Sequence, residues 1–308
     1  MPKKHRHGKL REPRWLSWIS YIGLRVLLAV YGLIPARRAY GLGAGLVSAL
    51  YPLFPGRRRV AVDNLLKSGI TDDRKTADRI ARKAFGHFAG HLCEAVKVGE
   101  VVTPENWREH VIFDGPESAR KLLFENTGLP VMLVTGHLGV WEAAGTILSY
   151  VRPMMAVARP MNNPYIERYL KQHHFRGTVA IISKKRGFTP DVIREWQQSK
   201  AALTLVMDQH ASKKQGVVVD FLGRPASTHT SPARLHLTTG VPMLVGAFIR
   251  EAPFRYRVFA GEPLTVTRTG DRERDTVATV TEINRQLGEI IRRYPEQYLW
   301  AHRRWREK

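Results

Sequence analysis

From about residue 130 onward, short apolar runs alternate with stretches that have helical periodicity. Seven runs are rich in β-branched and aliphatic residues, which is typical of buried strands: "PVMLVT", "MMAVA", "VAIIS", "ALTLVM", "GVVVDF", "MLVGAFI" and "RYRVFA". Helical stretches separate them, namely "WEAAGTILSYV", "NPYIERYLKQHHF", "TPDVIREWQQ" and "SPARLHLTTG", and a last helix is expected over residues 275–294. Strands that alternate with helices predict an α/β fold in which helices cover both faces of a central sheet.

Upstream, residues 63–102 have a helical pattern, and Asp72 and Asp73 are suited to a helix N-terminus. His87 and His91 are four residues apart, so they can share one face of this helix. A zinc site needs more ligands than two, and the sequence supplies neither a third ligand nor a carboxylate pair nearby. We therefore expect the two histidines to pack or to line a groove.

The N-terminal region combines basic and apolar segments. The apolar run over residues 19–34 contains Arg25 and is shorter than the roughly 20 residues that span a bilayer. A second run, "GLGAGLVSALYPLF", is also short, and basic residues flank both, which argues against a clean crossing. We predict that residues 15–55 form an uncleaved membrane-docking region, within an N-terminal part over 1–60 that precedes a catalytic domain over 61–308. The alternative is a pair of buried helices with an arginine-rich rim.

Charge and cysteine content narrow the classes of function. The 308 residues carry a formal net charge of +22, which favours an acidic partner such as nucleic acid, anionic lipid or an acidic carrier protein. The basic residues are scattered and no nucleic-acid reader motif is present, so a nucleic-acid-binding protein is disfavoured. Because Cys93 is the single cysteine, no intramolecular disulfide and no cysteine-based zinc site can form.

A histidine and a glutamate follow the first predicted strand in "VTGHLGVWEAAG". His137 is expected on the loop at the strand's carboxyl end, where open α/β sheets place ligands, and Glu142 in the first turn of the next helix, where the helix dipole favours a carboxylate. A carboxylate paired with an imidazole suits general base catalysis. With no G-x-S-x-G elbow and no H-E-x-x-H pattern, the hydroxyl to be activated would belong to a substrate, which suggests direct acyl transfer.

Polar residues also follow other predicted strands. We take five of them as substrate-binding or supporting candidates: Arg159, Asn162, Asp208, Gln209 and Thr228. Ordinary turn and cap chemistry is the alternative for each, since Asn-Pro and Ser-Pro sequences are themselves turn signals. Three strand ends that supply polar groups to one sheet edge nevertheless favour a site.

Several ordered motifs resemble the bacterial lipid A biosynthesis acyltransferases, the late lauroyl and myristoyl transferases and their superfamily. They are "TGHLGVWEAAG", "ARPMNNPYIERYL", "LVMDQHASKKQGVVVDFLGRPASTHTSPARLHLTTGVPM" and "PEQYLWAHRRWR", and the resemblance runs from about Ala61 to the C-terminus. It implies a sandwich like that of the glycerolipid acyltransferases, with a central mixed sheet, helices on its faces and N-terminal membrane-docking helices. Val140 stands where many members have Asn, and the pattern fits the broad superfamily, which leaves the acceptor open.

The resemblance also implies an activity and a place in the cell. It implies an enzyme of lipopolysaccharide synthesis at the cytoplasmic face of the inner membrane, which moves a fatty acyl chain from an acyl carrier protein, or coenzyme A, to a lipid hydroxyl. His137 would be the base and Glu142 its partner, with Arg159 and Asp208 as supporting residues; no metal, nucleotide or other cofactor is implied. A different glycolipid or phospholipid acceptor, a thioester hydrolase of the same fold and a binding protein without chemistry remain alternatives.

Overall fold

The computed structural model describes residues 13–125, 127–158, 160–173, 179–183 and 187–306. The helices are α1 (Arg14–Gly32), α2 (Ala36–Leu50), η1 (Tyr51–Leu53), α3 (Pro55–Lys67), α4 (Arg74–Val101), α5 (Trp107–His110), α6 (Glu117–Phe124), α7 (Trp141–Ser149), α8 (Pro164–His173), α9 (Pro190–Ser199), α10 (Ser231–Thr239), α11 (Arg272–Arg293) and η2 (Pro295–Gln297). The strands are β1 (Val111–Asp114), β2 (Val131–Thr135), β3 (Met154–Ala158), β4 (Val179–Ser183), β5 (Ala202–Val206), β6 (Gly216–Phe221), β7 (Arg224–His229), β8 (Met243–Ala252) and β9 (Arg255–Ala260).

Seven strands form one mixed sheet in the order β1-β9-β8-β2-β5-β3-β4, and β6 and β7 form a separate antiparallel pair. All neighbours in the large sheet are parallel except β8 and β9, which form a hairpin. β2 is central and pairs with β5 on one side and β8 on the other. The chain therefore has the α/β fold that the sequence pattern predicts, and its sheet is mixed, as the resemblance implies.

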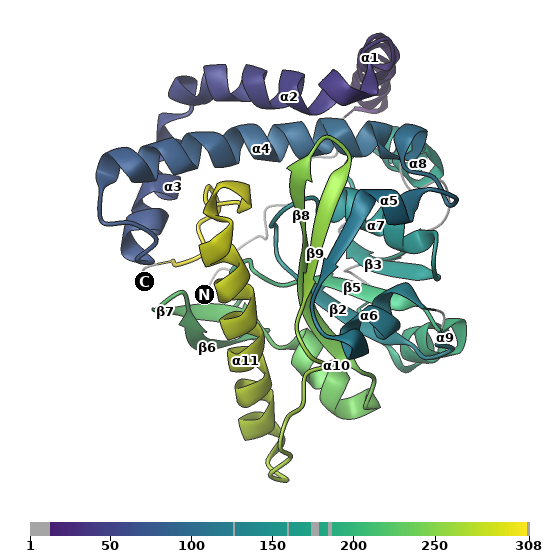
Figure 1. Cartoon of the computed structure of the whole chain (residues 1–308), viewed down its shortest axis with the longest axis vertical. Helices are drawn as coiled ribbons and strands as arrows, with labels where there is room; N and C mark the ends of the chain where they lie inside the picture. The colour runs from purple at the N-terminus through teal and green to yellow at the C-terminus, as the bar shows by residue number, and fades with distance from the viewer. Residues whose placement is uncertain (1–12, 126, 159, 174–178, 184–186, 307–308) are drawn as a thin grey trace, which may run out of the picture.

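Alternate side chains of β2 enter two different cores, because successive residues of a strand point to opposite faces. Met132 and Val134 pack with the apolar stripe of α11, which includes Ile283. Val131 and Leu133 join the second core, to which α6 and α7 contribute. Each face of the sheet is thus covered by helices (Figure 1), which makes the sheet a rigid support for its loops.

The predicted helix over 63–102 is two helices. A turn at residues 68–73 separates α3 from α4, and the Asp73 carboxylate accepts hydrogen bonds from the backbone N–H groups of Lys75 and Thr76. This is the N-cap that the sequence predicts, and it satisfies donors that have no partner within the helix. β1 and β7 were not expected: β1 has four residues, and β7 contains Pro225, which lowers its strand propensity.

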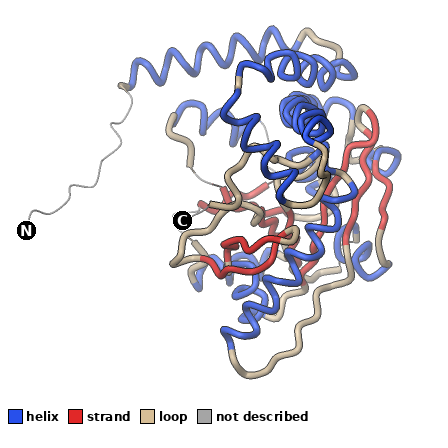
Figure 2. Tube along the Cα trace, turned by 90° about the vertical axis from the view of Figure 1, so that its left-hand side faces the viewer, coloured by secondary structure: helices blue, strands red, loops and turns tan. Residues whose placement is uncertain are grey.

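The N-terminal helices lie outside the two sheet cores. α2 runs along α4 (Figure 1), and the contact is close, since a Cβ on Gly90 would lie 2.9 Å from the backbone oxygen of Tyr40. α1 extends past this layer (Figure 2), with apolar side chains such as Trp18 and Leu27 exposed. Within the described residues, α1 alone is long and apolar enough to cross a membrane, and 6% of that window is buried. Length and composition of this kind also occur in signal sequences, so they are weak evidence on their own.

Candidate functional site

The site begins where β2 ends. β2 stops at Thr135, Gly136 and His137 follow, and α7 starts at Trp141 with Glu142 in its first turn. These positions agree with the sequence-based expectation for the loop and for the helix start. Since β5 is the parallel neighbour of β2, the residues that follow β5 reach the same edge of the sheet.

His137 and Asp208 meet at this edge. The His137 Nδ1 atom lies 2.8 Å from Oδ1 of Asp208, and 24% of the histidine side chain is exposed against 3% of the aspartate. Because an ionised carboxylate only accepts hydrogen bonds, Nδ1 carries the proton. Nε2 of neutral His137 is therefore the basic nitrogen, and Nε2 of the Gln209 amide lies 3.4 Å from it.

Burial and charge shift the pKa values of His137 and Asp208 in opposite directions. Burial alone lowers the pKa of His137, but the charge and hydrogen bond of Asp208, with a smaller effect of the Glu142 charge, outweigh burial and raise the pKa above its usual value. Burial likewise raises the pKa of Asp208, but the charge and hydrogen bonds of His137 outweigh it and hold that pKa below the usual range. Asp208 is therefore ionised and His137 is a stronger base than a free imidazole.

The expectation that Glu142 fixes the histidine tautomer is wrong, since Asp208 occupies Nδ1. Glu142 acts on His137 through its charge. H-x-x-x-x-E spacing made Glu142 conspicuous in the sequence, whereas Asp208 is distant along the chain and becomes a neighbour only through the β2–β5 pairing.

Backbone hydrogen bonds fix the loop that carries His137. The backbone N–H of Leu299 donates to the His137 carbonyl at 3.1 Å, that of Gly139 to Gln297 at 2.9 Å, and that of Val140 to Phe248 at 2.8 Å. Gly139 has a φ of +66°, and a Cβ there would lie 1.9 Å from the Phe248 oxygen. The loop thus requires glycine at this position, both for its left-handed backbone and for the close approach of β8.

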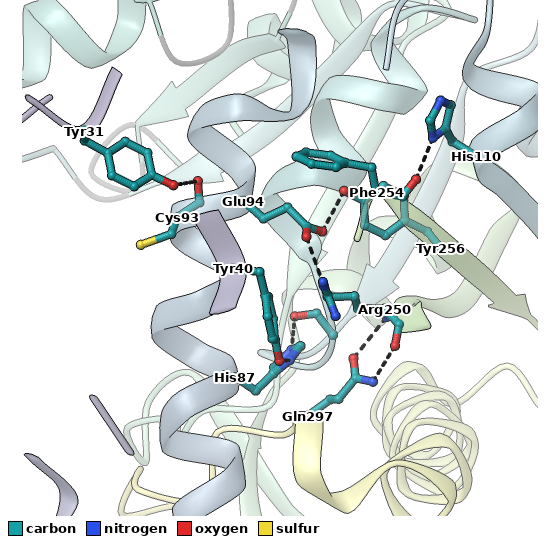
Figure 3. A network of polar contacts seen from close by, with 11 residues as sticks. Tyr31, Tyr40, His87, Cys93, Glu94, His110, Arg250, Phe254, Tyr256 and Gln297 are labelled. Carbon is teal, nitrogen blue, oxygen red and sulfur yellow. Dashed lines mark hydrogen bonds and ion pairs between the residues drawn. The ribbon is translucent and has the colours of Figure 1, made fainter. Parts of the chain in front are cut away.

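A buried histidine of α4 holds the same loop (Figure 3). His87 Nε2 lies 3.0 Å from the Gly139 carbonyl, which can only accept, so Nε2 carries the proton and Nδ1 accepts from the Tyr40 hydroxyl at 2.9 Å. Burial lowers the pKa of His87 to about 4, which keeps it neutral and preserves this pattern. We expected His87 to pack or to line a groove, and it is buried; its hydrogen bond to the loop that carries His137 was not predicted, because no local pattern indicates it.

The side chain of Gln297 links η2 to strand β8 near this loop. Its side-chain amide accepts from the backbone N–H of Arg250 at 3.0 Å and donates to the Arg250 carbonyl at 2.9 Å (Figure 3). The Arg250 guanidinium in turn donates to the buried carboxylate of Glu94 at 3.0 Å. Strand β8, η2 and α4 are thereby joined around the loop that carries His137.

Asp208 has further buried neighbours. Tyr298 is buried nearby, and burial, with the charge of Asp208, raises the pKa of Tyr298 well above its usual value. The Arg304 side chain is buried and its charge acts on Asp208. Arg304 also donates to the Thr228 hydroxyl, and Asn284 donates to the same hydroxyl at 3.2 Å. Thr228 therefore belongs to a hydrogen-bond network with Arg304 and Asn284, and the hydrogen bonds of the described residues do not join it to His137.

The remaining candidates are less central. Arg159 lies outside the described residues. Asn162 is exposed, while the adjacent Asn163 is buried, caps α8 and donates to the Ser17 carbonyl of α1 at 2.7 Å. The structure therefore brings His137, Asp208 and Gln209 together and places Asn163 at the junction of α1 and α8.

Fold and site together define an α/β protein in which a partly exposed histidine pairs with a buried aspartate at the carboxyl edge of a mixed sheet. The chain belongs to the bacterial lipid A biosynthesis acyltransferase family, whose model matches residues 3–307, so the resemblance seen in the motifs is confirmed and the protein is an acyltransferase.

Two curated relatives match nearly the whole chain. They are a lipid A biosynthesis palmitoleoyltransferase of Escherichia coli (strain K12) and a lipid A biosynthesis acyltransferase of Shigella flexneri, each 24% identical over 303 residues, which cover 96% of this chain and 93% of the relative. A crystal structure of a 1-acyl-sn-glycerophosphate acyltransferase from Thermotoga maritima aligns with a TM-score of 0.35 and 14% identity, covering 80% of this chain and 97% of that one.

Proposed function

We propose that the protein transfers a fatty acyl chain from an acyl thioester to a hydroxyl group of a lipid A precursor or a related glycolipid. His137 is the general base, Asp208 fixes its tautomer and stabilises the imidazolium, and the Glu142 charge adds to this effect. The observation that carries the proposal is the 2.8 Å contact between His137 Nδ1 and Asp208, which leaves Nε2 as a basic nitrogen at the carboxyl edge of the sheet.

The chemistry follows from this tautomer. Nε2 of His137 removes the proton of the acceptor hydroxyl while the hydroxyl oxygen attacks the thioester carbonyl carbon. The resulting oxyanion is stabilised by backbone N–H groups at the start of α7, which has no side-chain N-cap, and Arg159 is a second candidate donor. As the carbon–sulfur bond breaks, the imidazolium returns the proton to the thiolate, and the ester and a free thiol leave.

Charge and exposed apolar surface favour a membrane-bound reaction with acidic substrates. We propose an acyl carrier protein as donor, because the net charge of +22 attracts both an acidic carrier and anionic lipid headgroups. The exposed apolar residues of α1 fit a helix docked in the bilayer, at the cytoplasmic face of the bacterial inner membrane. The names of the two curated relatives specify lipid A, which supports a lipid A precursor as the acceptor.

The test uses purified protein in detergent with acyl carrier protein and coenzyme A thioesters, together with a lipid A precursor. We expect one acyl chain to be added by the wild type and by His236→Gln, which changes an imidazole on α10, but not by His137→Gln. If thioester is cleaved and no lipid gains mass in any glycolipid or phospholipid assay, the protein is a thioester hydrolase. Transfer by His137→Gln at the wild-type rate would falsify the assignment of the base.

A further inference from the structure

A groove rich in arginine lies between the start of α3 and the C-terminal segment. Two adjoining cavities of about 650 and 540 Å³ form it, and both are lined by Val60, Arg303 and Arg306. Arg57 lines the first cavity and Arg224 the second. We call the site defined by these four arginines the arginine groove.

Hydrogen bonds hold the groove in shape before any ligand arrives. The side-chain amide of Asn64 in α3 donates to the carbonyls of Trp300 and His302, at 2.8 and 2.9 Å. The Arg57 guanidinium donates to the Ala301 carbonyl at 3.1 Å. Arg304 is buried, whereas Arg303 and Arg306 are exposed and line both cavities. Hydrogen bonds therefore fix the C-terminal segment as one wall of the groove, with Arg303 and Arg306 exposed on it.

Described carboxylates do not neutralise Arg303 and Arg306. Among the lining residues that the structure describes, Asp63 is the one carboxylate, and its ion-pair partner is Arg74 at 4.0 Å. Neither Arg303 nor Arg306 forms an ion pair with a described residue. Like charges held close together repel each other, so an anionic ligand that bridges them is bound favourably, and the planar guanidinium group matches phosphate oxygens in geometry.

One wall of the groove contacts the loop that carries Asp208 and Gln209. His302 lines its first cavity, and the His302 Nε2 atom accepts the backbone N–H of His210 at 3.3 Å. His210 is the residue after Gln209, whose amide contacts His137. A ligand anchored in the groove thus lies beside the loop that carries Asp208 and Gln209.

Apolar residues border the groove on the side of the N-terminal helices. Phe54 lines the first cavity, and Leu50 and Leu53 precede it along the chain; all three side chains are exposed. A phosphorylated lipid matches both features, because its headgroup suits the arginines and its chains suit the apolar rim. The acidic surface of a folded carrier protein matches the charge but not the apolar rim.

We propose that the arginine groove binds a phosphate group of the lipid acceptor and thereby places the acceptor hydroxyl beside His137. This inference rests on the proposed function, since it assigns a binding site to the acceptor of that reaction. The phosphate forms charge-assisted hydrogen bonds with Arg303 and Arg306, and the acyl chains of the acceptor lie along the apolar rim.

Direct binding tests the proposal without turnover. We would measure the dissociation constant of a phosphorylated lipid A precursor, and of the same lipid after phosphatase treatment, in detergent micelles with no acyl donor. The variant is Arg303→Gln/Arg306→Gln, and the control is Arg234→Gln/Arg272→Gln. The control pair lies at a separate cavity on α10 and α11 and removes the same charge. Thermal unfolding of each variant establishes that it is folded.

We expect wild type and control to bind the phosphorylated lipid at least about tenfold more tightly than the groove variant does, since a hydrogen bond to a charged group is worth about one decade in affinity. The dephosphorylated lipid should bind all three equally. Equal loss in the control, or no preference of the wild type for phosphate, overturns the site. Phosphate-dependent binding without acyl transfer supports the site and refutes the proposed function. In the transfer assay, a rise in the KM of the donor alone assigns the groove to the donor and overturns the proposal.

Discussion

Replacing Asp208 by asparagine changes the charge at His137 and leaves the side-chain volume nearly the same. The carboxylate lies 2.8 Å from Nδ1 and its side chain is 3% exposed, so solvent screens the pair weakly. Two unit charges about 4 Å apart interact by about 4 kcal/mol at an effective dielectric constant of about 20. Loss of that interaction from the imidazolium that forms in the transition state corresponds to about a 10³-fold lower rate.

The Asp208→Asn substitution lowers the rate through a second effect as well. The asparagine amide can donate to Nδ1, which moves the imidazole proton to Nε2 and removes the base from the side of the acceptor. We therefore expect kcat of Asp208→Asn to fall by about 10² to 10⁴, with little change in the KM of either substrate. Since Asp208 raises the pKa of His137, the acid limb of the kcat profile should also move to lower pH.

The assay is transfer at saturating donor and acceptor from pH 5 to pH 9, alongside Glu142→Gln and Asp191→Asn. Asp191 is exposed on α9 and should leave both rate and profile unchanged. Glu142→Gln should move the acid limb less than Asp208→Asn does, because the Glu142 charge has the smaller effect on His137. Turnover of Asp208→Asn within about threefold of wild type would refute the reasoning, because a general acid or base contributes at least about 10² in rate.

Three further predictions concern the loop that carries His137 and the His137–Asp208 pair. Gly139→Ala should slow turnover and lower the melting temperature, because the left-handed backbone costs about 1–2 kcal/mol and the new Cβ collides with the Phe248 oxygen. His87→Phe should destabilise the protein by about 1–3 kcal/mol, measured in urea, since it leaves the buried Gly139 carbonyl without its donor, and His87→Gln should restore part of the loss. The contribution of the His137–Asp208 pair to unfolding free energy should be largest between about pH 4 and pH 6.5; it declines above, as His137 loses its proton, and below, as Asp208 gains one.

Each of these has a control and a contrary result. Gly145 lies inside α7 with nothing within 4 Å of a built Cβ, so Gly145→Ala should be tolerated; equal damage at both glycines would contradict the collision argument. Identical stability of His87→Gln and His87→Phe would show that packing, not the donor, matters. A wild-type advantage over Asp208→Asn that grows from pH 7 to pH 9 has the wrong sign for a pair with a raised histidine pKa.

Much of the fold could be predicted because it depends on local periodicity. All seven apolar runs form strands, and β3 and β4 have the expected bounds, since strand side chains alternate or are buried on both faces. β1 escaped prediction because it has only four residues, and β7 because it contains Pro225 and few apolar residues. The turn between α3 and α4 was missed because the apolar spacing on both sides of it remains helical.

The candidate site likewise combines features that adjacent residues determine with features that depend on distant contacts. His137, its loop and the first-turn position of Glu142 follow from adjacent residues, because a strand end, a glycine and a helix start are local features. The choice of Asp208 over Glu142 at Nδ1 depends on the pairing of β2 with β5, which joins residues 71 positions apart. Likewise, His87 reaches Gly139 only because α4 packs against α7 and the loop before it.

By itself, the sequence determined the class of fold, the place of the histidine on a strand-end loop, the apolar character of the segment that forms α1 and the excess of positive charge. These depend on residue type and short-range spacing. Only the tertiary structure decided which carboxylate hydrogen-bonds to the histidine, which helix contacts the loop that carries it, and which arginines line the groove. Contacts of this kind join distant parts of the chain, and they form only when the sheet and both cores bring those parts together.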